Sequence, residues 1–279
     1  MVNTKFIAEM TINHLGMRKI LQTMILSAQE AGASAVKLKL KNVKKYYKED
    51  NKKWRNFNFK NYRGSLELYH EDFVEIDRFC KKIDMPWFCT VHDSESLEFL
   101  QQFNLSFFKV ASMDSGDMNF VSEVAEVAKR NSAGLVISVG GKSLEFIDKI
   151  IKEVETYSVD LHLLHTVSIY PTPLGESNTG RIDVLKERYA KYDWVNVGYS
   201  GHEIGFSASL LAARKGVSMI ERHFTLSRDF HIHHIAAAIT PEQYSLMVNI
   251  AKEMDIEDNN LLNDKQAGED KFLVNRDYV

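Results

Sequence analysis

Eight short apolar runs, rich in β-branched residues, alternate with amphipathic segments along the 279-residue sequence. We expect these runs to be strands at residues 5–10, 35–40, 86–91, 107–112, 135–140, 161–167, 196–201 and 219–224. Between them, apolar residues recur at three- and four-residue spacing, which predicts helices over 17–32, 93–103, 118–130, 143–154, 206–216 and 241–254. Eight consecutive strand–helix units are typical of the α/β fold called the (β/α)8 or TIM barrel, whose catalytic residues lie at the carboxyl ends of the strands.

The alternation predicts one barrel domain over residues 1–279, with a single insertion. The insertion, at about 42–70, follows the second strand and is polar, aromatic and basic, so we expect a functional loop or lid instead of a simple connector. A short acidic, amide-rich tail follows about residue 255. A doubly wound sheet is the weaker alternative, because no glycine-rich phosphate-binding turn follows the first strand.

Composition argues against several classes of function. The net charge is −3, from 35 basic and 38 acidic residues, which gives no basic field for non-specific nucleic-acid binding. The two cysteines, Cys80 and Cys89, suggest reduced thiols in a cytosolic protein. The N-terminus lacks the pattern of a secretory signal, and no run of about 18 apolar residues occurs. We therefore expect a cytoplasmic protein that binds neither nucleic acid nor a membrane.

Lysines interrupt strands that should read as continuous apolar runs in a parallel barrel. In the second strand, the two-residue period places Lys37 and Lys39 opposite Val36 and Leu38. Because the apolar face must meet the helices, both lysines should point at the barrel axis, where Lys109 of the fourth strand joins them. Three such lysines would repel one another unless an anion such as a phosphate ester lay among them. The alternative is that they reach the rim and only pack there.

Hydroxyl side chains occur at the same ends of the strands. They are Thr90 on the third strand and Ser112, Ser138 and Ser200 at or near the ends of later strands. Each alone would be an ordinary strand-to-loop residue. Together with the three lysines, however, they offer donors to phosphate or carboxylate oxygens and predict an anion pocket.

Histidines and carboxylates form a second group. His202 follows the seventh strand and His223 ends the eighth, and these strands are neighbours in a closed barrel. The two imidazoles could therefore share one divalent ion, although a polar pair without metal is an equal alternative. Glu221 points the same way as His223 and could orient substrate or water, and Glu9 adds a carboxylate at the end of the first strand.

Seven segments occur in one order along residues 5–250: FIAEMTINHLG, AGASAVKLKL, FFKVASMD, LVISVGG, LLHTVSIYPTP, VGYSGHEIG and MIERHFTL. Together they resemble the catalytic barrel of the sialic acid synthase (N-acetylneuraminate synthase) family. That family condenses phosphoenolpyruvate with an N-acylated amino sugar, such as N-acetylmannosamine, to give a nonulosonic acid. The resemblance implies that a divalent metal polarises the sugar aldehyde and that phosphate leaves by C–O cleavage. A Schiff-base aldolase is a second hypothesis, but the strand at 161–167 lacks the lysine that it would need.

The resemblance also implies roles for individual residues. It assigns phosphoenolpyruvate to Lys37, Thr90, Lys109, Ser112, Ser138 and Ser200, and the sugar to Glu9, Asp114 and Tyr170. It assigns the metal to His202 and His223, with Mn²⁺ as the usual ion and Mg²⁺ or Co²⁺ as alternatives. We predict catalytic roles for Glu9, Lys37, Lys109 and Glu221, and further substrate contacts from Lys39 and His234.

The sequence departs from the family pattern at several positions. Gly201 stands where the family usually has an aspartate beside a metal ligand, and Lys39 replaces a common glutamine. His234 takes the place of an aspartate expected near the sugar, although His231, His233 and His234 could instead form an exposed polar loop. The acceptor need not be N-acetylmannosamine, so a synthase of another keto-deoxy sugar acid is one alternative. A non-catalytic barrel that binds a sugar or anion is the other.

Family members often carry a C-terminal antifreeze-like domain that reaches into the partner subunit's site. This sequence ends before such a domain, so we expect either the insertion or a separate antifreeze-like protein to cover the site. Trp54, Arg55, Tyr62 and Arg63 of the insertion are the candidate covering residues. A homodimer is a further expectation, because barrels of this kind often dimerise.

Overall fold

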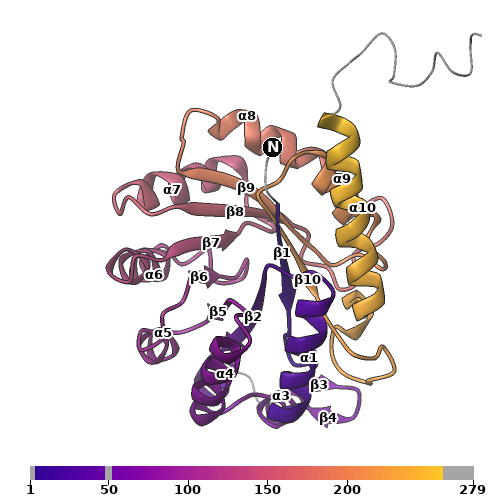
Figure 1. Ribbon diagram of the computed structural model, residues 1–279. Coiled ribbons are helices and arrows are strands. Elements are labelled where there is room, and N and C mark those ends of the chain that lie inside the picture. The colour runs from indigo at the N-terminus through magenta and orange to yellow at the C-terminus, as the bar shows by residue number, and fades with distance from the viewer. Residues whose placement is uncertain (1–3, 48–51, 260–279) are drawn as a thin grey trace, which may run out of the picture.

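Eight parallel strands close into a barrel in the computed structural model, which describes residues 4–47 and 52–259 (Figure 1). Around the barrel the strands follow the order β1-β10-β9-β8-β7-β6-β5-β2. They are β1 (Lys5–Glu9), β2 (Ala35–Leu40), β5 (Trp87–Val91), β6 (Phe107–Val110), β7 (Gly134–Ser138), β8 (Leu161–Thr166), β9 (Val195–Gly201) and β10 (Met219–His223). The predicted (β/α)8 barrel is therefore confirmed.

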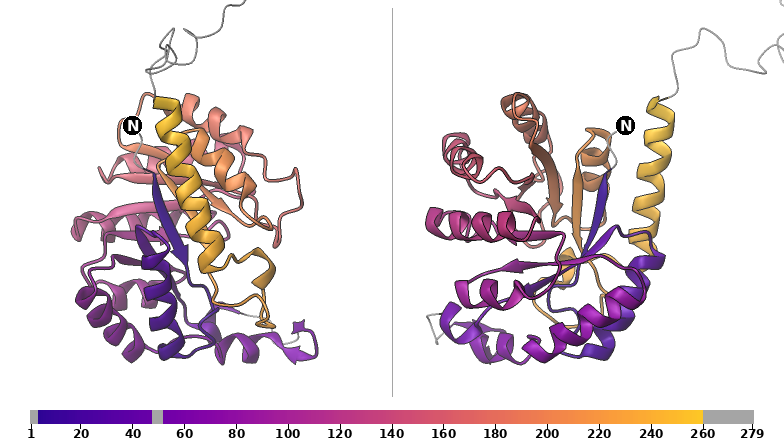
Figure 2. Two further views of the ribbon diagram at one scale, coloured as in Figure 1. Left: turned by 45° about the vertical axis from the view of Figure 1, so that its right-hand side comes forward. Right: turned by 60° about the vertical axis from the view of Figure 1, so that its left-hand side comes forward.

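Helices cover the outside of the barrel (Figure 2). They are α1 (Arg18–Glu30), α4 (His70–Lys82), α5 (Ser94–Leu100), α6 (Met118–Arg130), α7 (Leu144–Glu155), α8 (Gly180–Tyr189), α9 (Ser207–Arg214) and α10 (Pro241–Asn259). A short 3-10 helix, η1 (Ile235–Ala237), lies before α10. The apolar spacing had not singled out α4 and α8. Among the described residues, no helix has the length and apolar character needed to cross a membrane.

Capping side chains determine where several helices begin. Asp93, Asp117 and Ser143 each accept a hydrogen bond from the backbone N–H three residues further on, at 2.8, 3.2 and 3.2 Å. Each bond satisfies an amide that the first turn of a helix leaves unpaired. After the cap of α6, apolar residues four positions apart lie on the helix face that packs against the barrel. Val124 and Ala128 are two of them, and both are buried.

Alternation along the strands divides the barrel interior into an apolar and a polar part. The inward side chains near the amino ends of the strands form a buried apolar cluster of Ile7, Ala35, Phe88, Val136, Leu164 and Met219. Two residues further along the same strands, the same face carries polar side chains: Glu9, Lys37, Thr90, Ser138, Thr166 and Glu221. The predicted inward orientation of Lys37 and Lys39 is confirmed, and Val36 and Leu38 face the helices.

The insertion at 42–70 is more ordered than a loop. It contains α2 (Val43–Tyr46), a hairpin of β3 (Lys53–Trp54) and β4 (Phe57–Asn58), and α3 (Phe59–Gly64). Aromatic packing holds it together, since Trp54 stacks on Tyr62 with ring centroids 4.4 Å apart. Residues 48–51 lie outside the described residues. So does most of the predicted tail, because α10 continues to Asn259 and residues 260–279 are not described.

A buried ion pair joins the loops that follow β9 and β10. Arg222 is fully buried and donates hydrogen bonds to Glu203 Oε1 at 2.7 Å and to the Ala237 carbonyl oxygen at 3.2 Å. Arg222 lies in β10 between Glu221 and His223. Its outward network therefore fixes the strand end that directs those two side chains inward.

Replacing Glu203 with alanine should leave the Arg222 guanidinium buried without a charge partner. We expect the free energy of unfolding, measured by urea denaturation, to fall by about 3–5 kcal/mol. Asp148→Ala is the matched control, because it breaks an exposed ion pair with Arg188, which contributes little. Equal losses in the two variants would contradict this assignment.

Candidate active site

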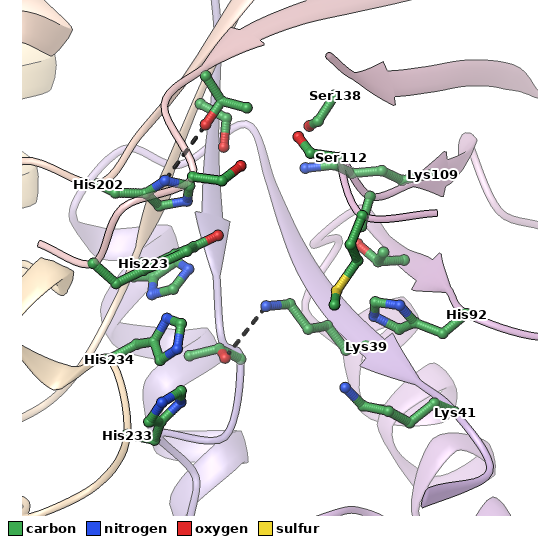
Figure 3. Close-up of a pocket in the computed structure, with 18 of the residues that line it drawn as sticks. Lys39, Lys41, His92, Lys109, Ser112, Ser138, His202, His223, His233 and His234 are labelled. Carbon is green, nitrogen blue, oxygen red and sulfur yellow. Dashed lines mark hydrogen bonds between the residues drawn. The ribbon is translucent and has the colours of Figure 1, made fainter. Parts of the chain in front are cut away.

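A cavity of about 350 Å³ opens at the carboxyl ends of the barrel strands (Figure 3). Most of the predicted site residues line it: Lys37, Lys39, Thr90, Lys109, Ser112, Ser138, Tyr170, Ser200, His202, Glu221, His223 and His234. Glu9 and Asp114 do not line this pocket but lie behind residues that do, as described below. The structure thus brings together side chains that are up to about two hundred residues apart in sequence.

Two lysines and two carboxylates form a buried cluster at the floor of the pocket. Lys37 pairs with Glu9 and donates a hydrogen bond to Thr90 Oγ1 at 2.7 Å. Lys109 donates to both carboxylate oxygens of Glu221, at 2.6 and 2.7 Å, and Lys37 Nζ lies 3.4 Å from Glu221 Oε1. The four charged side chains are 5% exposed or less. The alternating charges offset the cost of burying each one.

This cluster corrects the expectation that the axial lysines need a bound anion. Glu9 and Glu221 already balance Lys37 and Lys109. Burial alone would raise the pKa of Glu221, but Lys109 and Lys37 outweigh that effect and lower it to about 2. Glu221 is therefore a carboxylate at neutral pH, and it can hold the two ammonium groups in place but cannot donate a proton.

Hydroxyl groups surround Lys109 at one end of the pocket (Figure 3). Ser112 Oγ accepts a hydrogen bond from the Gly140 backbone N–H at 3.0 Å. Gly140 is needed there, because a Cβ atom would lie 2.9 Å from Ser112 Oγ and 2.5 Å from Ser168 Oγ. Ser138 Oγ is buried without a partner among the described residues. A lysine beside hydroxyls with spare hydrogen-bonding capacity can receive an anion.

Four histidines line the opposite wall, in the order His202, His223, His234 and His233 (Figure 3). The ring centroids of His202 and His223 are 5.3 Å apart. His202 Nδ1 donates to the Val167 carbonyl at 2.8 Å, which leaves Nε2 as an acceptor, and His223 Nδ1 is buried without a partner. Burial lowers the pKa of both, that of His202 to about 3, so both imidazoles are neutral.

Two neutral imidazoles with free nitrogens fit a divalent metal ion. Water or substrate oxygens would have to complete the coordination, because the described residues include no group of three or more His, Cys, Asp or Glu that could hold a metal. The glycine at position 201 does not deprive the pocket of a metal ligand. A Cβ atom there would lie 2.5 Å from Glu203 Oε2 and 3.0 Å from Arg222 Cδ, on the outer side of β9. An aspartate at this position would point away from the cavity, so its absence removes no ligand.

His92 is a site residue that the sequence analysis missed. Burial lowers its pKa far below 6.5, so the ring is neutral, and Nδ1 donates to Asp114 Oδ2 at 2.7 Å. Tyr46 donates to the other carboxylate oxygen at 3.0 Å. His92 Nε2 is buried without a partner among the described residues, and the residue lines the pocket, so the ring can accept a hydrogen bond from a ligand there. Asp114 thus acts behind His92.

The insertion supplies one wall of the pocket through Lys52, Tyr47, Phe59 and Arg63, next to Lys41 at the end of β2. Of the four residues expected to cover the site, only Arg63 lines the cavity. Trp54 and Tyr62 lie behind His233, whose backbone N–H donates to the Tyr62 hydroxyl at 3.1 Å. Arg55 stacks outside, 5.1 Å from the Trp54 ring.

The alternative prediction, that the loop after β10 is exposed and polar, is wrong for His233 and His234. His233 and His234 line the pocket, and only His231 is exposed. Tyr170 packs between two parts of this wall, with its ring centroid 4.0 Å from that of His202 and 3.9 Å from that of His234. Stacking of this kind fixes the orientation of the imidazoles.

Asp114 should make stability depend on pH. Burial raises its pKa from 3.8 to about 6, so the folded state binds more protons than the unfolded state between these values. The contribution of Asp114 to the free energy of unfolding is therefore complete below about pH 4. It is lost as pH rises through 6, by up to about 1.4 kcal/mol per pH unit. Urea denaturation between pH 4 and 6 should show a smaller decline for Asp114→Asn than for the wild type. Parallel curves would contradict the raised pKa.

The chain is similar in sequence to several known proteins. The NeuB family model matches residues 24–260. An uncharacterized protein of Methanocaldococcus jannaschii is 30% identical over 88% of this chain and 69% of its own length. The N-acetylneuraminate-9-phosphate synthase of Drosophila melanogaster is 29% identical over 80% of this chain, which spans only 60% of that synthase. The pseudaminic acid synthase of Campylobacter jejuni is 27% identical over 98% of this chain and 79% of its own.

A solved structure shows the same fold. The N-acetylneuraminic acid (sialic acid) synthetase of Leptospira borgpetersenii, in complex with citrate, superposes with a TM-score of 0.83. The alignment covers 97% of this chain and 90% of that one, at 24% identity. At this identity the likeness concerns the barrel alone.

Proposed function

The chain belongs to the NeuB family, and on that premise we propose that it is a phosphoenolpyruvate-dependent synthase of a sialic-acid-like nonulosonic acid. The names of two of these relatives support the reaction class, since they are synthases of such sugar acids, but they differ in product. We therefore propose an aldose of the N-acyl amino sugar type as the acceptor. The observation that carries the proposal is a pocket with cations and hydroxyls at one end and two neutral histidines on the facing wall.

Phosphoenolpyruvate would bind at the end of the pocket that holds Lys109, Ser112 and Ser138. Ammonium and hydroxyl donors suit its phosphate and carboxylate oxygens. Glu9 and Glu221 hold the Lys37 and Lys109 side chains in place near this end. Preorganised cations stabilise negative charge as it develops on the departing phosphate, without rearranging at the moment of reaction.

His202 and His223 would hold a divalent cation, with Mn²⁺ as our first choice and Mg²⁺ or Co²⁺ as alternatives. Such an ion, when bound, polarises a carbonyl oxygen as a Lewis acid. Val167 and Tyr170 hold the His202 ring in the orientation that presents Nε2 to the cavity. C3 of phosphoenolpyruvate would attack the sugar aldehyde, water would add at C2, and phosphate would leave with C–O cleavage. The neutral His92 can accept a hydrogen bond from that water, whose proton would leave with the phosphate.

Phosphate release tests this function directly. The purified protein, phosphoenolpyruvate and Mn²⁺ are combined with a panel of N-acyl mannosamines, hexoses and pentoses, with and without a chelator. We expect release that requires a sugar and stops with the chelator. Phosphoenolpyruvate labelled with ¹⁸O in the bridging oxygen should give labelled phosphate. No release across the panel, while phosphoenolpyruvate still binds, would instead support a non-catalytic barrel.

Replacing His202 with alanine should lower kcat at least about 100-fold, because Lewis-acid polarisation contributes several kcal/mol. The KM for phosphoenolpyruvate should change little, since His202 lies across the pocket from Lys109. His231→Ala removes an exposed histidine of the adjoining loop and serves as the control. A His202→Ala enzyme as active as this control, in the presence of Mn²⁺, would exclude the histidine as a ligand.

A further inference from the structure

Positive charge is distributed unevenly along the pocket. At its floor, Glu9 and Glu221 balance Lys37 and Lys109, and Lys39 Nζ lies 3.6 Å from Glu9 Oε1. At its outer end the wall carries three further cations: Lys41, Lys52 and Arg63. Glu221 is the one carboxylate that lines the pocket among the described residues. No carboxylate among the described residues therefore lines the outer end of the cavity beside these cations.

Two of the three outer cations have no carboxylate partner among the described residues. Among the described residues, no carboxylate forms an ion pair with Lys41 or Lys52. Lys41 Nζ lies 3.4 Å from the Tyr47 hydroxyl, and Lys52 Nζ lies over the Phe59 ring at 5.1 Å. Arg63 is 6% exposed and pairs with Glu67 through one terminal nitrogen at 2.7 Å.

Arg63 also keeps an unused donor. Its Nε atom is buried without a hydrogen-bond partner, although the residue lines the cavity. An unsatisfied buried donor on a charged group is costly unless a ligand or water meets it. Burial and the nearby Arg63 charge lower the pKa of Lys41 to about 7. A charged Lys41 is therefore unfavourable beside Arg63 unless an anion lies between them.

The outer cations are separate from the end proposed for phosphoenolpyruvate. Figure 3 shows Lys109, Ser112 and Ser138 together at one end, Lys39 between, and Lys41 at the other end facing His233 and His234. An anion held among the hydroxyls would thus leave Lys41 unoccupied. Tyr47 and Phe59 lie beside the outer cations, with their ring centroids 5.3 Å apart. These rings could pack on the apolar parts of a sugar.

We propose that Lys41, Lys52 and Arg63 form a second anion site, which binds a phosphate or carboxylate substituent of the acceptor sugar. The inference rests on the proposed function, since it assigns one end of that enzyme's acceptor. It narrows the acceptor to an anionic aldose. Ammonium and guanidinium groups are suited to such oxyanions, and three of them suit a phosphate dianion.

Matched acceptors test the site. N-acetylmannosamine, its 6-phosphate and the corresponding uronic acid differ only at one end of the sugar. With phosphoenolpyruvate and Mn²⁺, an anionic acceptor should give a kcat/KM at least about 10-fold above that of the neutral sugar, because a hydrogen bond to a charged group is worth about 1.5–3 kcal/mol. The phosphate and the carboxylate arms identify which anion is bound. A preference for the neutral sugar would overturn the inference while leaving the synthase intact.

Variants locate the effect. Lys41→Gln and Lys52→Gln should each raise the KM for the preferred anionic acceptor by about 10-fold or more and leave the KM for phosphoenolpyruvate unchanged. Lys53→Gln removes an exposed lysine next to Lys52, outside the pocket, and is the matched control. A rise in the KM for phosphoenolpyruvate alone would mean that its own anionic groups occupy the outer end, which would overturn the inference.

A binding measurement separates this inference from the proposed function. If no sugar supports phosphate release, calorimetric titration with N-acetylmannosamine 6-phosphate is compared between wild type, Lys41→Gln and Lys53→Gln. Binding that is lost only in Lys41→Gln keeps the anion site although the synthase reaction fails. Equal binding in all three proteins, or binding to none, overturns the anion site.

Discussion

The buried cluster of Glu9, Lys37, Lys109 and Glu221 is the constraint on which the rest of the pocket depends. Burying any one of these charges alone would cost several kcal/mol, so each requires the others. β1, β2, β6 and β10 supply the four side chains, and the closed barrel brings those strands together. Pairing fixes the positions of the Lys37 and Lys109 side chains at the floor of the pocket. The cluster thus converts a fold-level property, inward alternation, into a preorganised electrostatic site.

Above this floor the pocket has two chemically different walls. One carries neutral histidines whose burial keeps them unprotonated and free to act as ligands or acceptors. The other carries lysines, from Lys39 to Lys41, and continues into the insertion. The insertion is therefore part of the pocket and contributes charge where the sugar would lie. Gly201 illustrates how the surroundings support this arrangement, since its missing side chain leaves room for the Glu203–Arg222 pair that holds the end of β10.

Much of this could be predicted from sequence because the barrel enforces a two-residue period. Lys37, Lys39 and Lys109 were assigned inward on that basis, and the pairing of β9 with β10 places His202 near His223. The same period, continued past the strand ends, would also have found Lys41 after Lys39 and His92 after Thr90. The two-residue period does not predict how far a side chain lies from the surface of the pocket. Glu9 and Asp114 have the expected chemistry but lie behind other side chains, and the order of the insertion depends on aromatic contacts between residues with no shared pattern.

The most direct test of the central claim is a crystal structure of the protein with phosphoenolpyruvate and Mn²⁺. Anomalous scattering near the manganese edge locates the ion independently of the surrounding density. We predict manganese bound to His202 and His223, and phosphoenolpyruvate at the end of the pocket with Lys109, Ser112 and Ser138. Phosphoenolpyruvate bound outside the barrel mouth, or manganese bound away from both histidines, would contradict it.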